Sequence, residues 1–154
     1  MSLPTAAGTH LVVPARSVVA PVRVFRGDDR KPPAVFAEGF HVPCICANVD
    51  LKSYGLSNTR SPWVGYSRKE SQAAMFPQTA RGSTWVYEVD RPGTGIDVTR
   101  TLGYGHLFRN EREVIFLHDM PPSRIRRAVW WSWGMPTSRV VDNPGYDPFS
   151  SWRC

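Results

Sequence analysis

The distribution of proline and glycine limits what this chain can fold into. Fourteen prolines and twelve glycines occupy 26 of its 154 positions. Proline breaks the hydrogen bonding of a helix interior and glycine lowers helix stability, so this composition argues against a helical bundle. Because hydrophobic residues still make up 42% of the chain, a core can form. We therefore expect one α+β domain of short strands, turns and small helices.

Alternating apolar and polar residues indicate the strands. Strands are predicted at residues 21–25, 61–67, 83–89, 111–118 and, after a proline pair, 121–134. Helix formers predict one short helix at 34–40, capped by Gly39, and another at 68–76, preceded by Ser67 as an N-cap. The remaining predictions are a loop at 26–33, a turn at 90–95, a short helical turn at 96–103 and a turn-rich tail at 140–154.

Residues 1–20 are expected to form an N-terminal arm, and residues 21–154 a single domain. The first ten residues carry no Lys or Arg, and the longest apolar run is the short VIFL, so neither a signal peptide nor a membrane span is predicted. We expect a cytosolic chain, export without a signal, or a domain of a longer protein. The net charge of +6 fits nucleic acid, anionic small ligands and acidic proteins equally well.

The three cysteines do not predict a metal site. Cys44 and Cys46 form a C-x-C pair in an apolar stretch, without a second ligand pair or a suitably spaced histidine. We interpret both as buried core residues, and Cys154 as exposed at the end of the chain.

Two short patterns carry chemistry. Glu111 and Glu113 begin an apolar strand, where residues two apart share a face and their carboxylates repel. Arg26, Asp28 and Arg30 form an R-x-D-x-R pattern at a strand end, and arginine binds phosphate oxygens in bidentate fashion. Alone, the first pattern fits a solvated strand edge and the second a surface salt-bridge cluster.

The two patterns in this order resemble the mono-ADP-ribosyltransferases of the cholera and pertussis toxin type, the R…S-T-S…E-x-E class. The stretches VFRGDDRKPPAVFAEGF (24–40) and EREVIFLHDMPPSRI (111–125) carry the resemblance, which runs from about Arg23 to about Trp133. It implies an ADP-ribosyltransferase-like split β-sandwich, with small helices on the N-terminal half.

The resemblance also implies roles for these residues. That family cleaves the nicotinamide–ribose bond of NAD and transfers ADP-ribose through an oxocarbenium-like transition state. Glu113 would hold the ribose hydroxyl and stabilise the cation, and Glu111 would orient or deprotonate the acceptor. Arg26 would bind the NAD phosphate and ribose. Asp28 would fix Arg26 or a neighbouring loop, and Arg30 would bind phosphate or brace the loop.

The serine segment of that family is altered here. Its Ser-Thr-Ser corresponds to Gly65–Tyr66–Ser67, so Gly65 replaces the serine that supports the catalytic glutamate. Ser67 and Tyr66 are retained as NAD-binding candidates. Tyr104 and Phe108 lie in the loop before E-x-E, where the family contacts its acceptor, and we expect substrate recognition there, with simple packing as the alternative.

The function implied is an NAD-dependent toxin or effector domain that uses no metal and has NAD hydrolysis as a side reaction. Glu rather than Gln at position 111 implies a protein arginine as acceptor. The charge of +6 keeps DNA or RNA open as acceptor, and the loss of the first serine keeps open a degenerate NAD- or protein-binding module. A secreted or injected effector acting in the target-cell cytoplasm would need a delivery protein and a cognate immunity protein.

Three tryptophans near the C-terminal end, Trp130, Trp131 and Trp133, are expected to pack in the core and at its edge. The alternative is a stacking platform for nucleic-acid bases, which needs exposed rings among basic residues. Three arginines precede them, at positions 124, 126 and 127.

Overall fold

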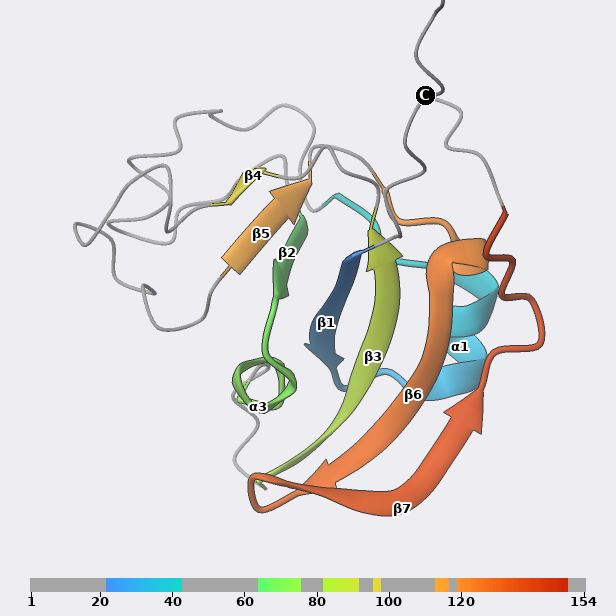
Figure 1. Cartoon of the computed structure of the whole chain (residues 1–154). Helices are drawn as coiled ribbons and strands as arrows, with labels where there is room; N and C mark the ends of the chain where they lie inside the picture. Colours follow the sequence, from blue (N-terminus) through green and yellow to red (C-terminus); the bar gives the residue numbers. More distant parts are fainter. Residues whose placement is uncertain are drawn as a thin grey trace, which may run out of the picture.

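An antiparallel sheet of seven strands organises the described part of this computed structural model, residues 22–42, 64–75, 82–91, 96–97, 113–116 and 119–149 (Figure 1). The strand order is β4-β5-β2-β1-β3-β6-β7. The strands are β1 Val22–Asp28, β2 Val64–Ser67, β3 Ser83–Arg91, β4 Ile96–Asp97, β5 Glu113–Phe116, β6 Ile125–Ser132 and β7 Met135–Asp142. The helices are α1 Pro32–Glu38, α3 Glu70–Ala73 and the 3-10 helix η3 Pro122–Arg124. The expected α+β class is confirmed.

Several predicted boundaries of strands and helices were wrong. β1 continues to Asp28, into the predicted loop, because it pairs with β3 along its whole length. Helix α1 begins at Pro32 rather than at residue 34, since proline fits the first helical turn. Helix α3 is shorter than predicted, and Ser67 does not cap it. The Ser67 hydroxyl instead accepts a hydrogen bond from the N–H of Lys69 (3.0 Å) in the turn before the helix.

Two segments differ in type from the prediction. Residues 96–97 form β4, not a helical turn, because they pair with β5. Residues 135–142 form β7, where the sequence predicted no strand before a turn-rich tail. β7 is an exposed edge strand, so it shows no apolar alternation and tolerates a proline. Its pairing with β6, rather than its own composition, determines the structure.

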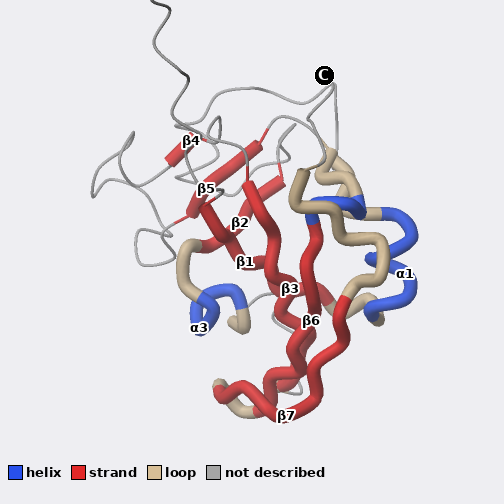
Figure 2. The backbone as a smooth tube through the Cα atoms, turned by 45° about the vertical axis from the view of Figure 1, so that its right-hand side comes forward, coloured by secondary structure: helices blue, strands red, loops and turns tan. Residues whose placement is uncertain are grey.

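The alternating residues of the strands build two cores on opposite faces of the sheet. The neighbours Val24 and Phe25 on β1 point into different clusters, as do Tyr87 and Val86 on β3. The larger core packs against α1, and the smaller one packs against α3 through Ala73. Figure 2 shows the two helices well separated, at different parts of the sheet.

The sheet is nearly divided between β1 and β2. One register pair, Phe25 with Ser67, joins these two strands, whereas β1 and β3 pair from Val22–Arg91 to Asp28–Trp85. The sheet therefore consists of β4–β5–β2 and β1–β3–β6–β7, joined at a single point. This division agrees with the expected split architecture.

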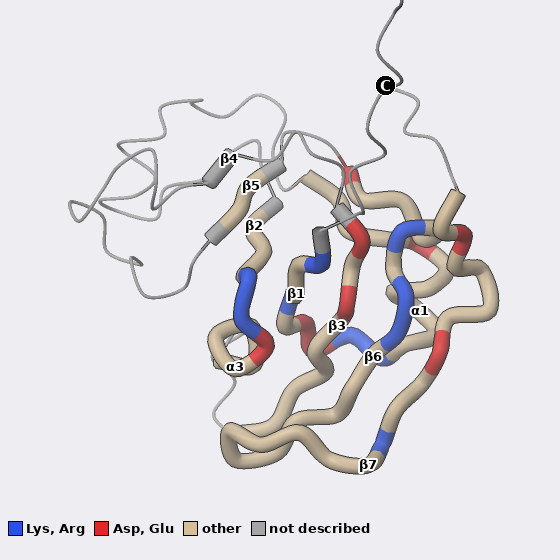
Figure 3. The backbone as a smooth tube through the Cα atoms, viewed as in Figure 1, with Lys and Arg blue, Asp and Glu red and all other residues tan. Residues whose placement is uncertain are grey.

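A register shift between β3 and β6 brings two arginines of β6 to the same carboxylate of β3. The β3–β6 register skips Arg126, so both Arg126 and Arg127 reach the buried Glu88, at 3.1 and 2.6 Å. Arg23 on β1 contacts the same carboxylate at 2.9 Å. Acidic residues on β3 thus lie between basic residues on β1 and β6 (Figure 3). These arginines tie three strands together.

The predicted packing of the tryptophans is partly wrong. Trp131 is buried, and Trp130 packs against Trp85 with ring centroids 5.1 Å apart. Trp133, however, is 82% exposed at the β6–β7 turn. The cysteines lie outside the described residues.

The end of α1 is fixed to the segment before η3. Phe40 and Met120 exchange two backbone hydrogen bonds, at 3.0 and 2.7 Å. Gly39 caps the helix as predicted and has a φ of +74°, and a Cβ on it would lie 2.1 Å from the Met120 carbonyl oxygen. Beyond it, Asp119 accepts the N–H of Val42 at 2.6 Å. Position 39 therefore requires glycine, both for its positive φ and because a Cβ would clash with the Met120 carbonyl oxygen.

We predict that Gly39→Ala lowers the free energy of unfolding by about 2–4 kcal/mol, because a left-handed conformation and a backbone clash add together. Gly134→Ala is the matched control, since Gly134 also has a positive φ (+76°) but a Cβ added to it would meet no atom within 4 Å. It should cost about 1 kcal/mol. Urea unfolding of both variants measures the difference, and equal losses would contradict the role of the Met120 contact.

Candidate functional site

A single arginine lies where the two parts of the sheet meet. Arg26 projects from β1, with its guanidinium carbon 5.3 Å from the centre of the Phe40 ring and 5.9 Å from that of Tyr66. These distances fall in the range of cation–π attraction. We call Arg26, Phe40 and Tyr66 the arginine cradle. It brings together β1, the end of α1 and β2.

The near-division of the sheet determines how Arg26 is held. Continuing the Phe25–Ser67 register would bring Gly65 opposite Gly27, but the β1–β2 pairing does not extend that far. The Gly65 carbonyl instead accepts a hydrogen bond from Nη1 of Arg26, at 2.6 Å. The side chain of Arg26 thus adds one hydrogen bond to β2 where the backbone pairing of β1 and β2 has ended. Its guanidinium is fixed in orientation at the junction.

One nitrogen of this guanidinium is unsatisfied within the described part of the chain. Its buried Nε has no hydrogen-bond acceptor among the described residues, and none of their carboxylates lies within ion-pair distance. A buried donor without an acceptor costs about 1–3 kcal/mol, and more when it is charged. An anionic ligand with oxygen acceptors would relieve that cost. This side chain therefore fits a phosphate group.

Asp28 and Arg30 form a pair beside the cradle. Asp28 accepts hydrogen bonds from the backbone N–H of Arg30 at 2.9 Å and from its Nη2 at 2.9 Å. The pKa of Arg30 is raised, mainly by its hydrogen bond to Asp28. The guanidinium carbon of Arg30 also lies 5.6 Å from the Phe40 ring centre. The sequence predicts that Asp28 fixes either Arg26 or a neighbouring loop. In the structure Asp28 hydrogen-bonds Arg30 and so fixes that loop.

Two buried tyrosines adjoin the arginines, Tyr66 beside Arg26 and Tyr87 beside the backbone of Arg30. Burial raises the pKa of Tyr66 well above its usual value, and burial does the same to the pKa of Tyr87. A tyrosine is neutral at neutral pH even with its ordinary pKa, so these phenols add no negative charge there. The Tyr87 hydroxyl donates to the backbone carbonyl of Arg30 at 2.6 Å and so supports the loop from below. The uncompensated charge of the cradle is that of Arg26.

Ser67 occupies the junction itself. It pairs with Phe25 on one side and with Glu113, the first residue of β5, on the other. Strand alternation places Ser67 on the face opposite to Tyr66. Glu113 is placed by this backbone pairing, directly across from Ser67. Three other predicted site residues, Glu111, Tyr104 and Phe108, lie outside the described residues.

Sequence reasoning missed part of the cradle. Phe40 ends the stretch at 24–40 that carries the resemblance, but the sequence does not predict it as the ring beside the guanidinium groups of Arg26 and Arg30. The Gly65 carbonyl was missed because a glycine offers no side-chain signal. Tyr87, which supports the backbone of Arg30, could have been predicted as a buried residue, because the alternation of β3 places it on the face opposite to Val86.

Within the described ranges, no group of three or more His, Cys, Asp or Glu side chains could hold a metal ion. None of the helices that the structure describes is long and apolar enough to span a membrane.

Comparisons with known proteins agree with this geometry. Residues 24–146 match the model of the Scabin-like family. A "Guanine-specific ADP-ribosyl transferase" of Streptomyces coelicolor is 37% identical over 94 residues, which are 60% of this chain and 44% of that protein. The match thus spans less than half of the length of this curated relative.

Solved structures show the same fold. A guanine-specific ADP-ribosyltransferase superposes with a TM-score of 0.73 at 29% identity, covering 84% of this chain and 81% of the other. The Scabin toxin from Streptomyces scabies, solved in complex with NADH, gives 0.72 at 27% identity, with 84% and 78% covered. A guanine-specific ADP-ribosyltransferase with NADH and GDP gives 0.72 at 30% identity, with 84% and 80% covered.

These structures confirm the predicted ADP-ribosyltransferase-like fold, and they refine the predicted resemblance to cholera and pertussis toxins to a related group of enzymes. The family model covers most of the chain, from Val24 in β1 to Tyr146, just beyond β7. The chain therefore belongs to the Scabin-like family of ADP-ribosyltransferases.

Proposed function

We propose that this chain is a toxin or effector domain that transfers ADP-ribose from NAD to a guanine base. A guanine nitrogen would form a bond to C1′ of the nicotinamide ribose and lose a proton. The nicotinamide–ribose bond would break, and its electron pair would leave with neutral nicotinamide. Relatives and solved structures named guanine-specific, one of the structures with NADH and GDP, support the proposal.

The proposal that the chain binds NAD rests on the hydrogen bonding of the Arg26 guanidinium. Its buried Nε lacks an acceptor among the described residues, while Nη1 is held by the Gly65 carbonyl. A diphosphate offers several oxygen acceptors and negative charge, and a guanidinium matches phosphate geometry. We assign Arg26 to the NAD phosphates. Arg30, fixed by Asp28, would add a second cation beside Phe40.

The catalytic roles follow from chemistry and from strand position. We propose that Arg26, Gly65–Ser67 and the pair Glu111 and Glu113 occupy the three parts of the R…S-T-S…E-x-E pattern. Glu113 would stabilise the oxocarbenium-like transition state. Its backbone pairs with Ser67, the residue of β2 that is in register with β1. Glu111 would accept the proton of the attacking guanine.

The acceptor is where this proposal departs from the first expectation. Protein arginine was expected because position 111 holds Glu rather than Gln. The names of the relatives favour guanine instead, and the net charge of +6 suits a polyanionic acceptor. We therefore propose guanine in place of arginine. Tyr104 and Phe108 stay candidates for recognising the acceptor. Secretion or injection, a delivery protein and an immunity protein stay predictions.

We predict that Arg26→Lys raises the KM for NAD by about 10- to 100-fold, because lysine keeps the charge but loses the fixed donors of the guanidinium. Steady-state release of nicotinamide measures this effect. Arg139→Lys is the matched control, since Arg139 also stacks on aromatic rings, Trp85 and Trp130, but belongs to β7. A similar rise in both variants would argue against a specific phosphate contact at Arg26.

We predict that Glu113→Gln lowers kcat for nicotinamide release by at least about 100-fold, because the stabilising charge is lost from the transition state. Glu111→Ala should reduce transfer to guanine far more than hydrolysis of NAD, because it acts on the acceptor. Both reactions can be followed in one assay by chromatography of nicotinamide, ADP-ribose and the modified base. Equal loss of transfer and hydrolysis in Glu111→Ala would contradict its role.

The acceptor itself is tested by mass spectrometry. With NAD present, we predict that ADP-ribose is added to GDP or to a guanine-containing oligonucleotide, and not to an arginine peptide or to the same oligonucleotide with inosine in place of guanine. The Glu113→Gln variant supplies the background. Modification of the peptide alone would overturn guanine as the acceptor while leaving the NAD chemistry standing.

A further inference from the structure

An exposed tryptophan occupies a strained position at the tip of the β6–β7 hairpin. Ser132 pairs with Met135, so Trp133 and Gly134 form a two-residue turn with φ values of +52° and +76°. Such a turn favours Asn-Gly, and a bulky residue with positive φ is unusual. Trp133 is nevertheless 82% exposed, so burial does not offset the strain. Strain of this kind points to a role other than stability.

The indole of Trp133 is held on one side. The backbone N–H of Trp133 donates to the Gly82 carbonyl at 2.7 Å. Three atoms of the indole lie 3.0–3.4 Å from where a Cβ of Gly82 would be, so glycine at this position leaves room for the ring. One part of the ring therefore rests on the start of β3, while most of the side chain faces solvent. This is a pre-positioned aromatic surface.

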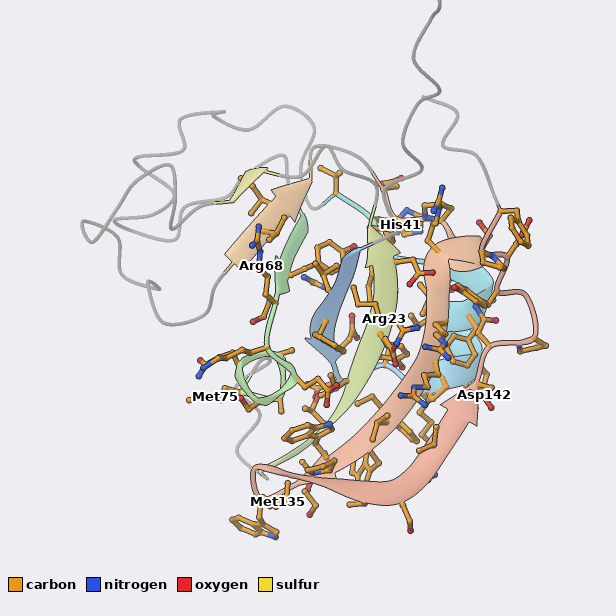
Figure 4. All side chains as sticks on the ribbon, in the orientation of Figure 1. Arg23, His41, Arg68, Met75, Met135 and Asp142 are labelled. Atoms are coloured by element: carbon orange, nitrogen blue, oxygen red, sulfur yellow. The ribbon has the colours of Figure 1, made fainter. Side chains whose placement is uncertain are left out.

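The surroundings of Trp133 suit a polyanion. From Val129 to Val141 the hairpin carries one charged side chain, Arg139, and no carboxylate. Figure 3 shows the tip of this hairpin without acidic residues. Met135, which is 67% exposed, lies beside the turn and extends its apolar surface (Figure 4). An exposed ring with apolar surface beside it, on a hairpin without carboxylates, offers a face on which a base can stack.

Trp133 also lies at the end of the sheet that carries the candidate site. β1 ends there at Asp28, which is in register with Trp85 and, through it, with Trp130. Trp133 is three residues beyond that row, which is about 10 Å along the strand at about 3.3 Å per residue. Two strand spacings of about 4.8 Å separate β1 from β6. The separation of Trp133 from Asp28 is therefore on the order of 14 Å. Arg26 lies two residues farther along β1, so its separation from Trp133 is on the order of 19 Å, about five or six nucleotides at about 3.4 Å each.

We propose that Trp133 stacks on a base of the nucleic-acid strand that carries the acceptor guanine, a few nucleotides from it. This inference rests on the proposed function and sharpens it, because it makes the preferred acceptor a polymer rather than a free nucleotide. The occupant is a single-stranded segment, whose unstacked bases are free to lie on the indole. A protein surface or a second copy of the chain is the competing occupant, and the experiment separates them.

The test compares an oligonucleotide with GDP in the variant Trp133→Asn. Asparagine is favoured in this turn, so the variant should fold at least as well as the parent while losing the ring. The dissociation constant of a fluorescein-labelled ten-nucleotide DNA strand containing one guanine, measured by anisotropy without NAD, should rise about 5- to 150-fold. Transfer to GDP and hydrolysis of NAD should stay within about twofold.

Two further variants sharpen the comparison. Trp133→Phe retains a stacking face and should recover most of the oligonucleotide affinity. Phe149→Ala removes another highly exposed aromatic side chain, outside the hairpin, and should change nothing. Rescue by phenylalanine would distinguish stacking from a merely structural role of the side chain.

Several outcomes would overturn the proposal. They are unchanged oligonucleotide affinity in Trp133→Asn, an equal loss of transfer to GDP and to the oligonucleotide, and self-association that depends on Trp133 without any effect on the oligonucleotide. Failure of the proposed function looks different. In that case no guanine substrate would be modified, although binding measured without NAD would still depend on Trp133.

Discussion

The hydrogen bond from Arg26 to the Gly65 carbonyl is the interaction on which the candidate site depends. β1 and β2 share one register pair, so the two parts of the sheet are joined by little backbone hydrogen bonding. Arg26 adds a side-chain link of 2.6 Å beside that pair. The junction thereby holds a half-buried cation against two aromatic rings, and its buried Nε has no acceptor among the described residues. The same side chain therefore links the two parts of the sheet and is the proposed ligand-binding group.

The partners of the other arginines show how much of the positive charge of the chain is available to a ligand. Arg23, Arg126 and Arg127 gather on Glu88, and Arg30 is paired with Asp28. These arginines serve the fold or brace a loop, and buried or shared pairs of this kind add little steering for a ligand. Within the described residues, Arg26 differs because it stacks and donates without a carboxylate partner. A net charge of +6 is therefore a weak guide to the binding site, whereas the partners of each arginine are a strong one.

The sequence predicted the elements that have strong local patterns and missed those that depend on pairing. The segment STWVYEV became β3, and Gly39 became the cap of α1, because alternation and a left-handed glycine are local properties. β7 was missed, since an exposed edge strand is specified by its partner β6. The sequence predicts Arg26, Asp28 and Arg30 as site residues by their type, and their binding of NAD stays a prediction. Their division of roles could not be predicted, because it depends on the Gly65 carbonyl and on Phe40, which reach Arg26 through tertiary structure.

The most direct test of the central claim follows the side chain of Arg26 itself. In a sample labelled with 15N, the Nε–H resonance of Arg26 can be assigned by its loss in Arg26→Lys and then observed during titration with NAD or ADP-ribose. A new acceptor at Nε should shift this proton downfield in a saturable way, while the resonance of Arg139 stays in place. Saturable binding of NAD with no change at the Arg26 Nε–H would contradict the account.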